Sequence, residues 1–128
     1  MVKGLVFDTS VWIEYFKANP IYFTSCQDHL DRSSVYSMEI IFAELLQGAR
    51  SGREVAIING YYENIPQLDH RGQIFKAGLF AQKEGLIGKG IGLIDSIIIY
   101  TTINHGCQLW TLDKRIINYL DKDYLYQE

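Results

Sequence analysis

The sequence predicts an α/β fold, with a mostly parallel central sheet flanked by helices on both faces. Short apolar runs of strand type alternate with segments of helical periodicity along the 128 residues. Strands separated by helices run parallel, because a parallel pair needs a crossover connection. The length and the 48% hydrophobic and 21% charged residues are typical of a globular protein, so we expect one domain over residues 1–128.

The first half of the chain contains strong start and stop signals. An apolar run of strand type ends at Phe7, Asp8 follows it at once, and a helical pattern continues until Asn19 and Pro20 stop it. Pro20 suits the first turn of a second helix, which should end near residue 31. A short strand is expected over residues 33–37, and Ser37 should cap a helix that ends in the glycine-containing segment 48–52.

The second half repeats the alternation. Further helices are expected over 53–62, 71–84 and 113–119, a strand over 107–112, a last strand over 124–126, and a connector or edge strand at 65–68. Residues 85–92 form a glycine-rich loop that lacks the terminal Lys-Ser/Thr of a phosphate-binding P-loop. Residues 93–105 are ambiguous, because their isoleucines favour a strand whereas their length favours a buried helix.

Charge and cysteine content narrow the possible functions. The net charge of −3 argues against a protein that binds nucleic acid by bulk charge, but allows a local basic rim. Cys26 and Cys107 have no partner motif and are expected to be buried free thiols. No apolar stretch is long enough to span a bilayer, so we expect a cytoplasmic protein. Basic residues that lie beside the acidic motifs could hold RNA phosphates, although solvated surface charge is the simpler interpretation for each: Lys3, Arg50, Arg53, Lys89, Lys114 and Arg115.

Four acidic residues stand at positions where chemistry is possible. Asp8 and Asp113 end strand-like runs and begin helices, and Asp95 begins a helix after the glycine-rich loop. Helix capping is the simpler interpretation of each of these three. Glu44 differs, because its i−4 and i−3 neighbours are isoleucines and it therefore lies next to the apolar face. A carboxylate there must be protonated, bound to a cation, or paired with an arginine or lysine.

Convergence of these acids at one edge of the sheet would predict a metal site. At ~6 Å and an effective dielectric near 20, each pair of like charges costs about 3 kcal/mol, so the cluster needs protonation or a divalent cation. Oxygen ligands alone favour Mg²⁺ or Mn²⁺. Such a site best supports attack of water on a phosphodiester. His29, His70 and His105 share no metal-ligand spacing, so zinc is not expected.

The ordered motifs resemble the PIN-domain family, and most closely its VapC-type ribonuclease toxins of type II toxin–antitoxin systems. The resemblance covers essentially the whole chain, and its segments are Val6-Phe7-Asp8-Thr9-Ser10-Val11-Trp12-Ile13, Ala43-Glu44-Leu45-Leu46-Gln47-Gly48-Ala49-Arg50, Gly92-Leu93-Ile94-Asp95-Ser96 and Leu109-Trp110-Thr111-Leu112-Asp113. The family usually has alanine where this chain has Ser96, a departure that removes no catalytic group.

The resemblance implies an α/β/α sandwich and a Mg²⁺-dependent endoribonuclease that leaves a 5′-phosphate and a 3′-hydroxyl. Asp8 and Asp95 would be the main Mg²⁺ ligands, with Mn²⁺ as an alternative ion. Asp113 would complete the metal site directly or through water, and Glu44 would orient a water or the nucleophile. Thr9, Ser10 and Thr111 would hold the carboxylates in place.

The same resemblance implies an RNA substrate and a cognate VapB-like antitoxin as partners. The aromatic residues of the first two helices exceed what a small core hides, so we expect part of this surface to bind the antitoxin and another part a second copy of the chain. These residues are Trp12, Tyr15, Phe16, Tyr22 and Phe23.

Two other classes of Mg²⁺-binding protein fit the sequence less well. A haloacid-dehalogenase-like phosphatase needs a second aspartate where Ser10 stands, and a phosphoryl-accepting, Mg²⁺-binding receiver module needs paired acids after the first strand. A non-catalytic nucleic-acid-binding module stays open, with acids that serve only as caps.

Overall fold

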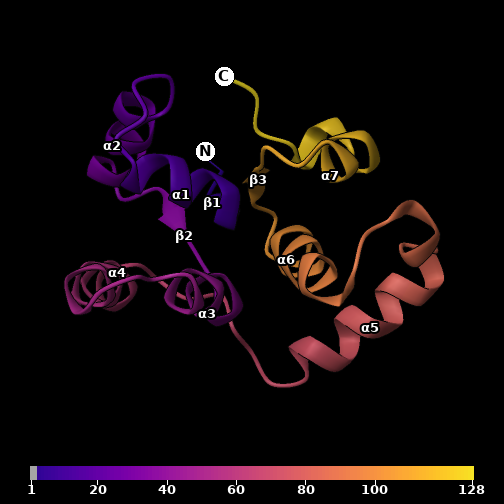
Figure 1. Ribbon diagram of the computed structural model, residues 1–128. Helices are drawn as coiled ribbons and strands as arrows, with labels where there is room; N and C mark the ends of the chain where they lie inside the picture. The colour runs from indigo at the N-terminus through magenta and orange to yellow at the C-terminus, as the bar shows by residue number, and fades with distance from the viewer. Residues whose placement is uncertain (1–2) are drawn as a thin grey trace.

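A three-stranded parallel sheet of order β2-β1-β3 forms the centre of the protein, seen in a computed structural model that describes residues 3–128 (Figure 1). The central strand β1 (Leu5–Phe7) pairs with β2 (Val35–Tyr36) on one side and with β3 (Gln108–Trp110) on the other. Single bridges between Ser37 and Gln67 and between Leu109 and Leu125 widen the sheet at both edges, again in the parallel sense.

Helices cover the sheet from both sides, which confirms the predicted α/β/α fold. The helices within residues 9–64 gather at the indigo-to-magenta side of the molecule and those within residues 73–119 at the orange-to-yellow side, with the strands between them (Figure 1). Two short 3₁₀ turns, η1 (Ile87–Lys89) and η2 (Lys122–Tyr124), complete the secondary structure. The helices are α1 (Thr9–Phe16), α2 (Phe23–Asp31), α3 (Glu39–Gln47), α4 (Gly52–Asn64), α5 (Gln73–Glu84), α6 (Leu93–Asn104) and α7 (Lys114–Tyr119).

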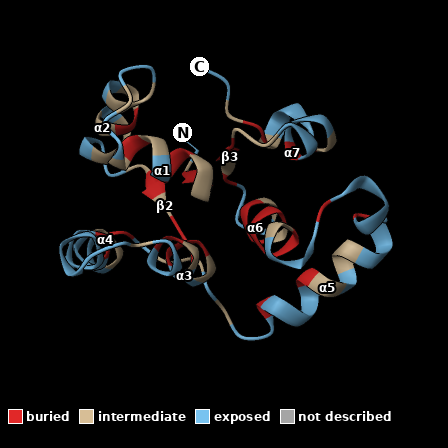
Figure 2. Ribbon diagram, viewed as in Figure 1, coloured by how far each residue is buried: buried red, intermediate tan, exposed pale blue. Residues whose placement is uncertain are grey.

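The ambiguous segment 93–105 is helix α6, and it is buried on most of its surface (Figure 2). A helix buried on most of its surface has only a weak amphipathic pattern, which explains why periodicity could not identify it. Its polar side chains find partners inside the protein. The Thr102 hydroxyl donates to the Ile98 carbonyl at 2.7 Å, and the Thr101 hydroxyl accepts from the Gln73 amide at 2.7 Å.

The aromatic residues of the first helix form core, which corrects the expectation that they supply an interface. Trp12 is fully buried, and its indole lies 5.1–5.6 Å, centroid to centroid, from the rings of Phe7, Phe42 and Tyr61. Tyr15 is only 4% exposed, and its hydroxyl bonds that of Tyr61 at 2.7 Å. Residues 16, 22 and 23 pack against the same core. Packing with α3 and α4, which the local sequence does not reveal, buries Trp12 and Tyr15 and leaves the other three aromatic residues partly exposed.

Three local predictions were wrong. Ser37 does not cap α3: Met38 is the cap residue, and the Asp69 carboxylate accepts the Glu39 N–H at 2.9 Å. The second helix begins at Phe23, one turn after the proline. The expected last strand over 124–126 is reduced to the single bridge at Leu125, preceded by η2.

Cys26 and Cys107 are buried free thiols, as predicted. Every helix within residues 3–128 is too short or too polar to cross a membrane.

Candidate active site

The fold brings the four predicted acids to one edge of the sheet. Asp8 directly follows β1, and Asp113 follows β3 and caps α7. Since β1 and β3 are parallel, their carboxyl ends lie at the same edge. Asp95 lies in the first turn of α6, and Glu44 lies on α3. The Asp95 carboxyl experiences the negative charge of Asp8, Asp113 and Glu44, so the other three acids all lie within electrostatic reach of Asp95.

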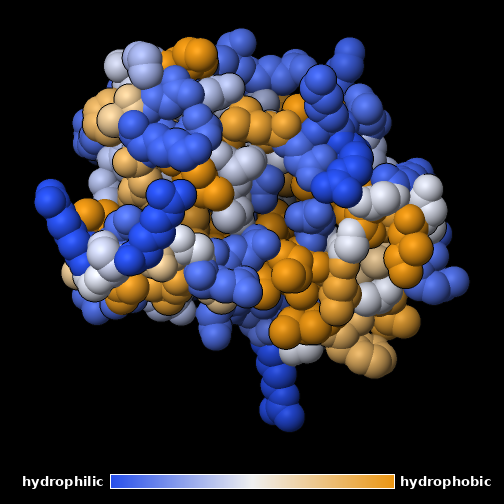
Figure 3. Space-filling model, viewed as in Figure 1, coloured by the Kyte–Doolittle hydropathy of each residue, from blue (hydrophilic) through white to orange (hydrophobic). Residues whose placement is uncertain are grey.

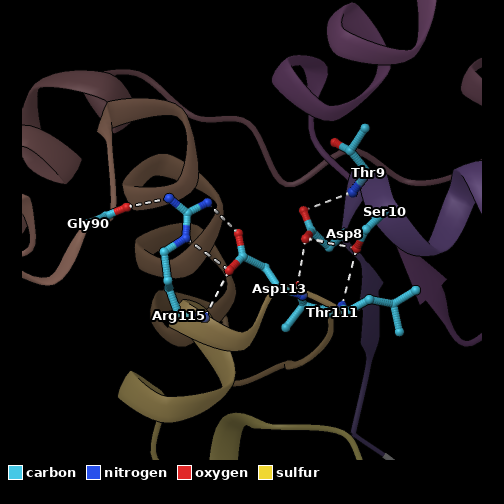
Figure 4. A network of polar contacts seen from close by, with 8 residues as sticks. Asp8, Thr9, Ser10, Gly90, Thr111, Asp113 and Arg115 are labelled. Carbon is cyan, nitrogen blue, oxygen red and sulfur yellow. Dashed lines mark hydrogen bonds and ion pairs between the residues drawn. The ribbon is translucent and has the colours of Figure 1, made fainter.

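Asp8 is a buried carboxylate held by three hydrogen bonds (Figure 4). It accepts from the Thr9 backbone N–H at 2.8 Å, the Thr111 hydroxyl at 2.7 Å and the Ser10 hydroxyl at 3.2 Å. These donors favour the ionised form, but burial outweighs them and raises the pKa of Asp8 above its ordinary value. Asp8 does cap α1, as the simpler interpretation expected. Capping alone does not explain its 5% exposure, because caps are usually solvated.

The same hydroxyls connect Asp8 to the segment that carries Asp113. The Ser10 hydroxyl accepts the Leu112 backbone N–H at 3.2 Å, and the Thr111 hydroxyl accepts the Asp113 backbone N–H at 3.1 Å. Each hydroxyl therefore donates to the Asp8 carboxylate and accepts from the chain after β3. This network fixes the two carboxyl-bearing segments relative to each other.

Glu44 is held by a hydroxyl and not by a cation. The Thr9 hydroxyl donates to its carboxylate at 2.6 Å, a short charge-assisted bond. Within the described part of the chain Glu44 makes no ion pair, so of the three alternatives left open by the sequence, pairing with an arginine or lysine is not observed. Each of the three hydroxyl residues that the resemblance assigned to this task therefore donates to a carboxylate: Thr9 to Glu44, and both Ser10 and Thr111 to Asp8.

Asp95 shows the electrostatic cost of the cluster. Burial raises its pKa first, and repulsion by Asp8, Asp113 and Glu44 raises it further, to about 6, although Arg115 opposes the shift. The neighbouring Ser96 is fully buried, and its hydroxyl donates to the Gly92 carbonyl at 2.8 Å. The serine that replaces the usual alanine thus bonds the backbone of its own helix.

Arg115 was not assigned to an acid by sequence reasoning, yet it pairs with Asp113. Its Nη2 lies 2.8 Å from Asp113 Oδ2 and its Nε lies 3.2 Å from Asp113 Oδ1, while its Nη1 donates to the Gly90 carbonyl at 2.8 Å (Figure 4). These bonds lower the pKa of Asp113 below its ordinary value. The sequence signal that could have predicted this ion pair is the Asp-x-Arg spacing at the start of α7, because both side chains then lie at the first turn of the helix.

The donor set fits a hard divalent cation. Carboxylates from separate elements repel one another at Asp95, and a bound cation would relieve that repulsion. In the arrangement described for residues 3–128, no three or more His, Cys, Asp or Glu side chains already form a group that could hold a metal ion. The histidines bond elsewhere, to Tyr126, the Leu68 carbonyl and the Thr101 carbonyl, in keeping with an oxygen-only site.

The family model described as PIN domain matches residues 5–122, a span that includes all four acids and Arg115. No curated protein matches the chain.

Proposed function

The chain belongs to the PIN domain family, whose members are generally Mg²⁺-dependent nucleases, and on that premise we propose that it is an endoribonuclease of the VapC toxin type. The observation that carries the proposal is the set of four carboxylates at one sheet edge, with the pKa of Asp95 raised to about 6 by burial and by the other three. The proposed enzyme is a single cytoplasmic domain, and its substrate is RNA.

Three aspartates are proposed to hold the metal. Asp8 and Asp95 would be direct ligands, and Asp113 would bind directly or through a water. The hydrogen bonds from Thr9, Ser10 and Thr111 support this assignment for Asp8, because they keep its carboxylate in one orientation. When bound, Mg²⁺ or Mn²⁺ supplies a Lewis acid that makes water a stronger nucleophile and stabilises charge on the phosphoryl oxygens.

Glu44 is proposed to orient the attacking water and accept its proton. Its carboxylate has no cationic partner in the described residues, and the Thr9 hydroxyl fixes it at 2.6 Å beside the Asp8 segment. Water attack forms the new phosphorus–oxygen bond and breaks the bond to the 3′ oxygen, which takes up a proton. The products are a 5′-phosphate and a 3′-hydroxyl.

A cleavage assay with an acid variant tests the proposal. We expect wild-type protein to cut RNA in Mg²⁺ or Mn²⁺, EDTA to abolish cleavage, and Asp8→Asn to lower the rate by about 10²-fold or more. Glu63→Gln, a charge-matched change of an exposed residue on α4, should leave the rate unchanged. Cleavage that survives both EDTA and Asp8→Asn would remove the metal-nuclease assignment.

The toxin assignment adds two proposed partners, a VapB-like antitoxin and a second copy of the chain. Large apolar side chains remain exposed, and several of them lie on α5 and on η1 after it, with Ile74 at 61%, Phe75 at 73%, Leu79 at 57% and Ile87 at 87% exposure (Figure 3). Ile21, between α1 and α2, is 71% exposed. We expect induced expression to stop cell growth and Asp8→Asn to be harmless. A monomeric chain without affinity for a small protein encoded beside it would contradict both partners.

A further inference from the structure

Arg115 occupies most of the binding capacity of Asp113. Asp113 Oδ1 accepts the Arg115 backbone N–H at 2.9 Å and its Nε at 3.2 Å, and Oδ2 accepts Nη2 at 2.8 Å. A carboxylate has about four acceptor positions, so these bonds leave roughly one. In this arrangement Asp113 has little capacity for another cation.

The pair is placed where a competitor can break it. The Arg115 side chain is 58% exposed and that of Asp113 is 23% exposed. Exposed ion pairs contribute only about 0–1 kcal/mol, so a divalent ion or a phosphate can displace either partner. Among the ion pairs of residues 3–128, this is the one that involves a member of the acidic cluster.

Gly90 provides the second attachment of the guanidinium. Its carbonyl accepts Nη1 at 2.8 Å, and a Cβ at this position would lie 3.3 Å from Arg115 Cδ. Gly90 has φ +76°, a left-handed conformation that glycine adopts without strain. Arg115 therefore bridges the start of α7 and the loop that leads into α6, the helix that carries Asp95.

We propose that Arg115 is a displaceable internal cation, which pairs with Asp113 in the free protein and moves to a phosphate of the RNA when substrate binds. A guanidinium forms the same two-pronged hydrogen bonds with a phosphate as with a carboxylate. Its transfer to RNA releases Asp113 for the metal. Metal and RNA therefore each strengthen the binding of the other, by the same factor. This inference rests on the nuclease function proposed above.

Calorimetric titration with Mn²⁺ tests the exchange. Arg115→Ala should bind Mn²⁺ more tightly than wild type by about 5-fold or more, the lower end of typical coupling between sites. Lys114→Ala removes the same charge from the adjacent exposed position and should change the affinity much less. Arg115→Lys keeps the positive charge but cannot form the two-pronged hydrogen bonds of a guanidinium, so its Mn²⁺ affinity should lie between those of wild type and Arg115→Ala.

The titration is repeated with a short single-stranded phosphorothioate RNA, chosen because it is cleaved slowly. RNA should tighten Mn²⁺ binding to wild type by a similar factor and have a much smaller effect on Arg115→Ala. Equal effects of Arg115→Ala and Lys114→Ala would overturn the inference, as would weaker Mn²⁺ binding by Arg115→Ala. If wild type bound no Mn²⁺, the proposed nuclease function itself would be refuted. If wild type bound Mn²⁺ and cleaved RNA, but RNA did not change its Mn²⁺ affinity, only the role of Arg115 would be refuted.

Discussion

Replacing Asp95 by asparagine is expected to stabilise the metal-free protein near pH 8 and to weaken metal binding. Asparagine has nearly the same shape as aspartate but carries no charge. The substitution therefore removes the repulsion that Asp95 experiences from Asp8, Asp113 and Glu44. A residue at a functional position often lowers the stability of the protein, and its replacement then raises the stability at the expense of function.

The size of the effect follows from the pKa of Asp95, which rises from 3.8 to about 6. A shift of this size corresponds to about 3 kcal/mol against the ionised form, before discounting for partial solvent exposure. An acid in the first turn of a helix also gains roughly 0.3–1 kcal/mol from the helix dipole, which the asparagine loses. Repulsion and burial outweigh the dipole, so we expect a net gain of about 1–2 kcal/mol, or ~3–10 °C in Tm.

The gain must depend on pH, because only ionised Asp95 is disfavoured. Its pKa in the folded protein lies above the value of 3.8 expected when unfolded. The contribution of Asp95 to stability is therefore complete below about pH 4 and is lost as the pH rises through 6. The advantage of Asp95→Asn should shrink accordingly as the pH falls from about 8 to below 4.

Urea unfolding in EDTA, followed by circular dichroism across this pH range, measures the difference. Glu63→Gln on the exposed surface of α4 is the matched control and should stay within about 0.5 kcal/mol of wild type at every pH. In a separate series without EDTA, added Mn²⁺ should raise the stability of wild type and have less effect on Asp95→Asn. A destabilised Asp95→Asn near pH 8, or a difference independent of pH, would refute the reasoning.

Four further substitutions test the packing and the hydrogen bonds of the fold. Thr111→Val removes the hydroxyl that donates to the buried Asp8 carboxylate and should cost about 1–3 kcal/mol in urea unfolding. Gly4→Ala should lower the free energy of unfolding by about 1–3 kcal/mol, because the new Cβ would lie 2.7 Å from the ring of Tyr36. Gly60→Ala lies in open space inside α4 and should raise the free energy of unfolding by about 0.5–1 kcal/mol. Equal Tm values for the two variants would contradict both predictions. Trp12→Ala empties a fully buried site and should cost about 3–5 kcal/mol, and a smaller loss would mean that the aromatic cluster collapses around the cavity.

Much of the candidate site can be located from local sequence. Asp8 and Asp113 follow strand-like runs directly, and parallel strands bring their carboxyl ends to one edge, so their proximity follows from the order of elements alone. The position of Asp95 depended on whether residues 93–105 form a helix. Local pattern left that open, because the segment is apolar on most of its surface.

Tertiary packing decided the partners of side chains that are distant in sequence. Thr9 bonds Glu44 across 35 positions, and Thr111 bonds Asp8 across 103. Trp12 is covered by rings from three other elements, so the centre of the aromatic surface expected for a partner is part of the core. No short-range pattern specifies which side chains meet across such separations.

By itself the sequence determined the alternation of strands and helices, the parallel sheet and the residues that could bear charge at its edge, because periodicity and helix starts are local properties. Only the tertiary structure decided how those charges are balanced. Glu44 is held by a hydroxyl, Asp95 is left under repulsion, and Asp113 is neutralised by Arg115. Electrostatic energy depends on distance and burial, and both are set by how the helices pack on the sheet.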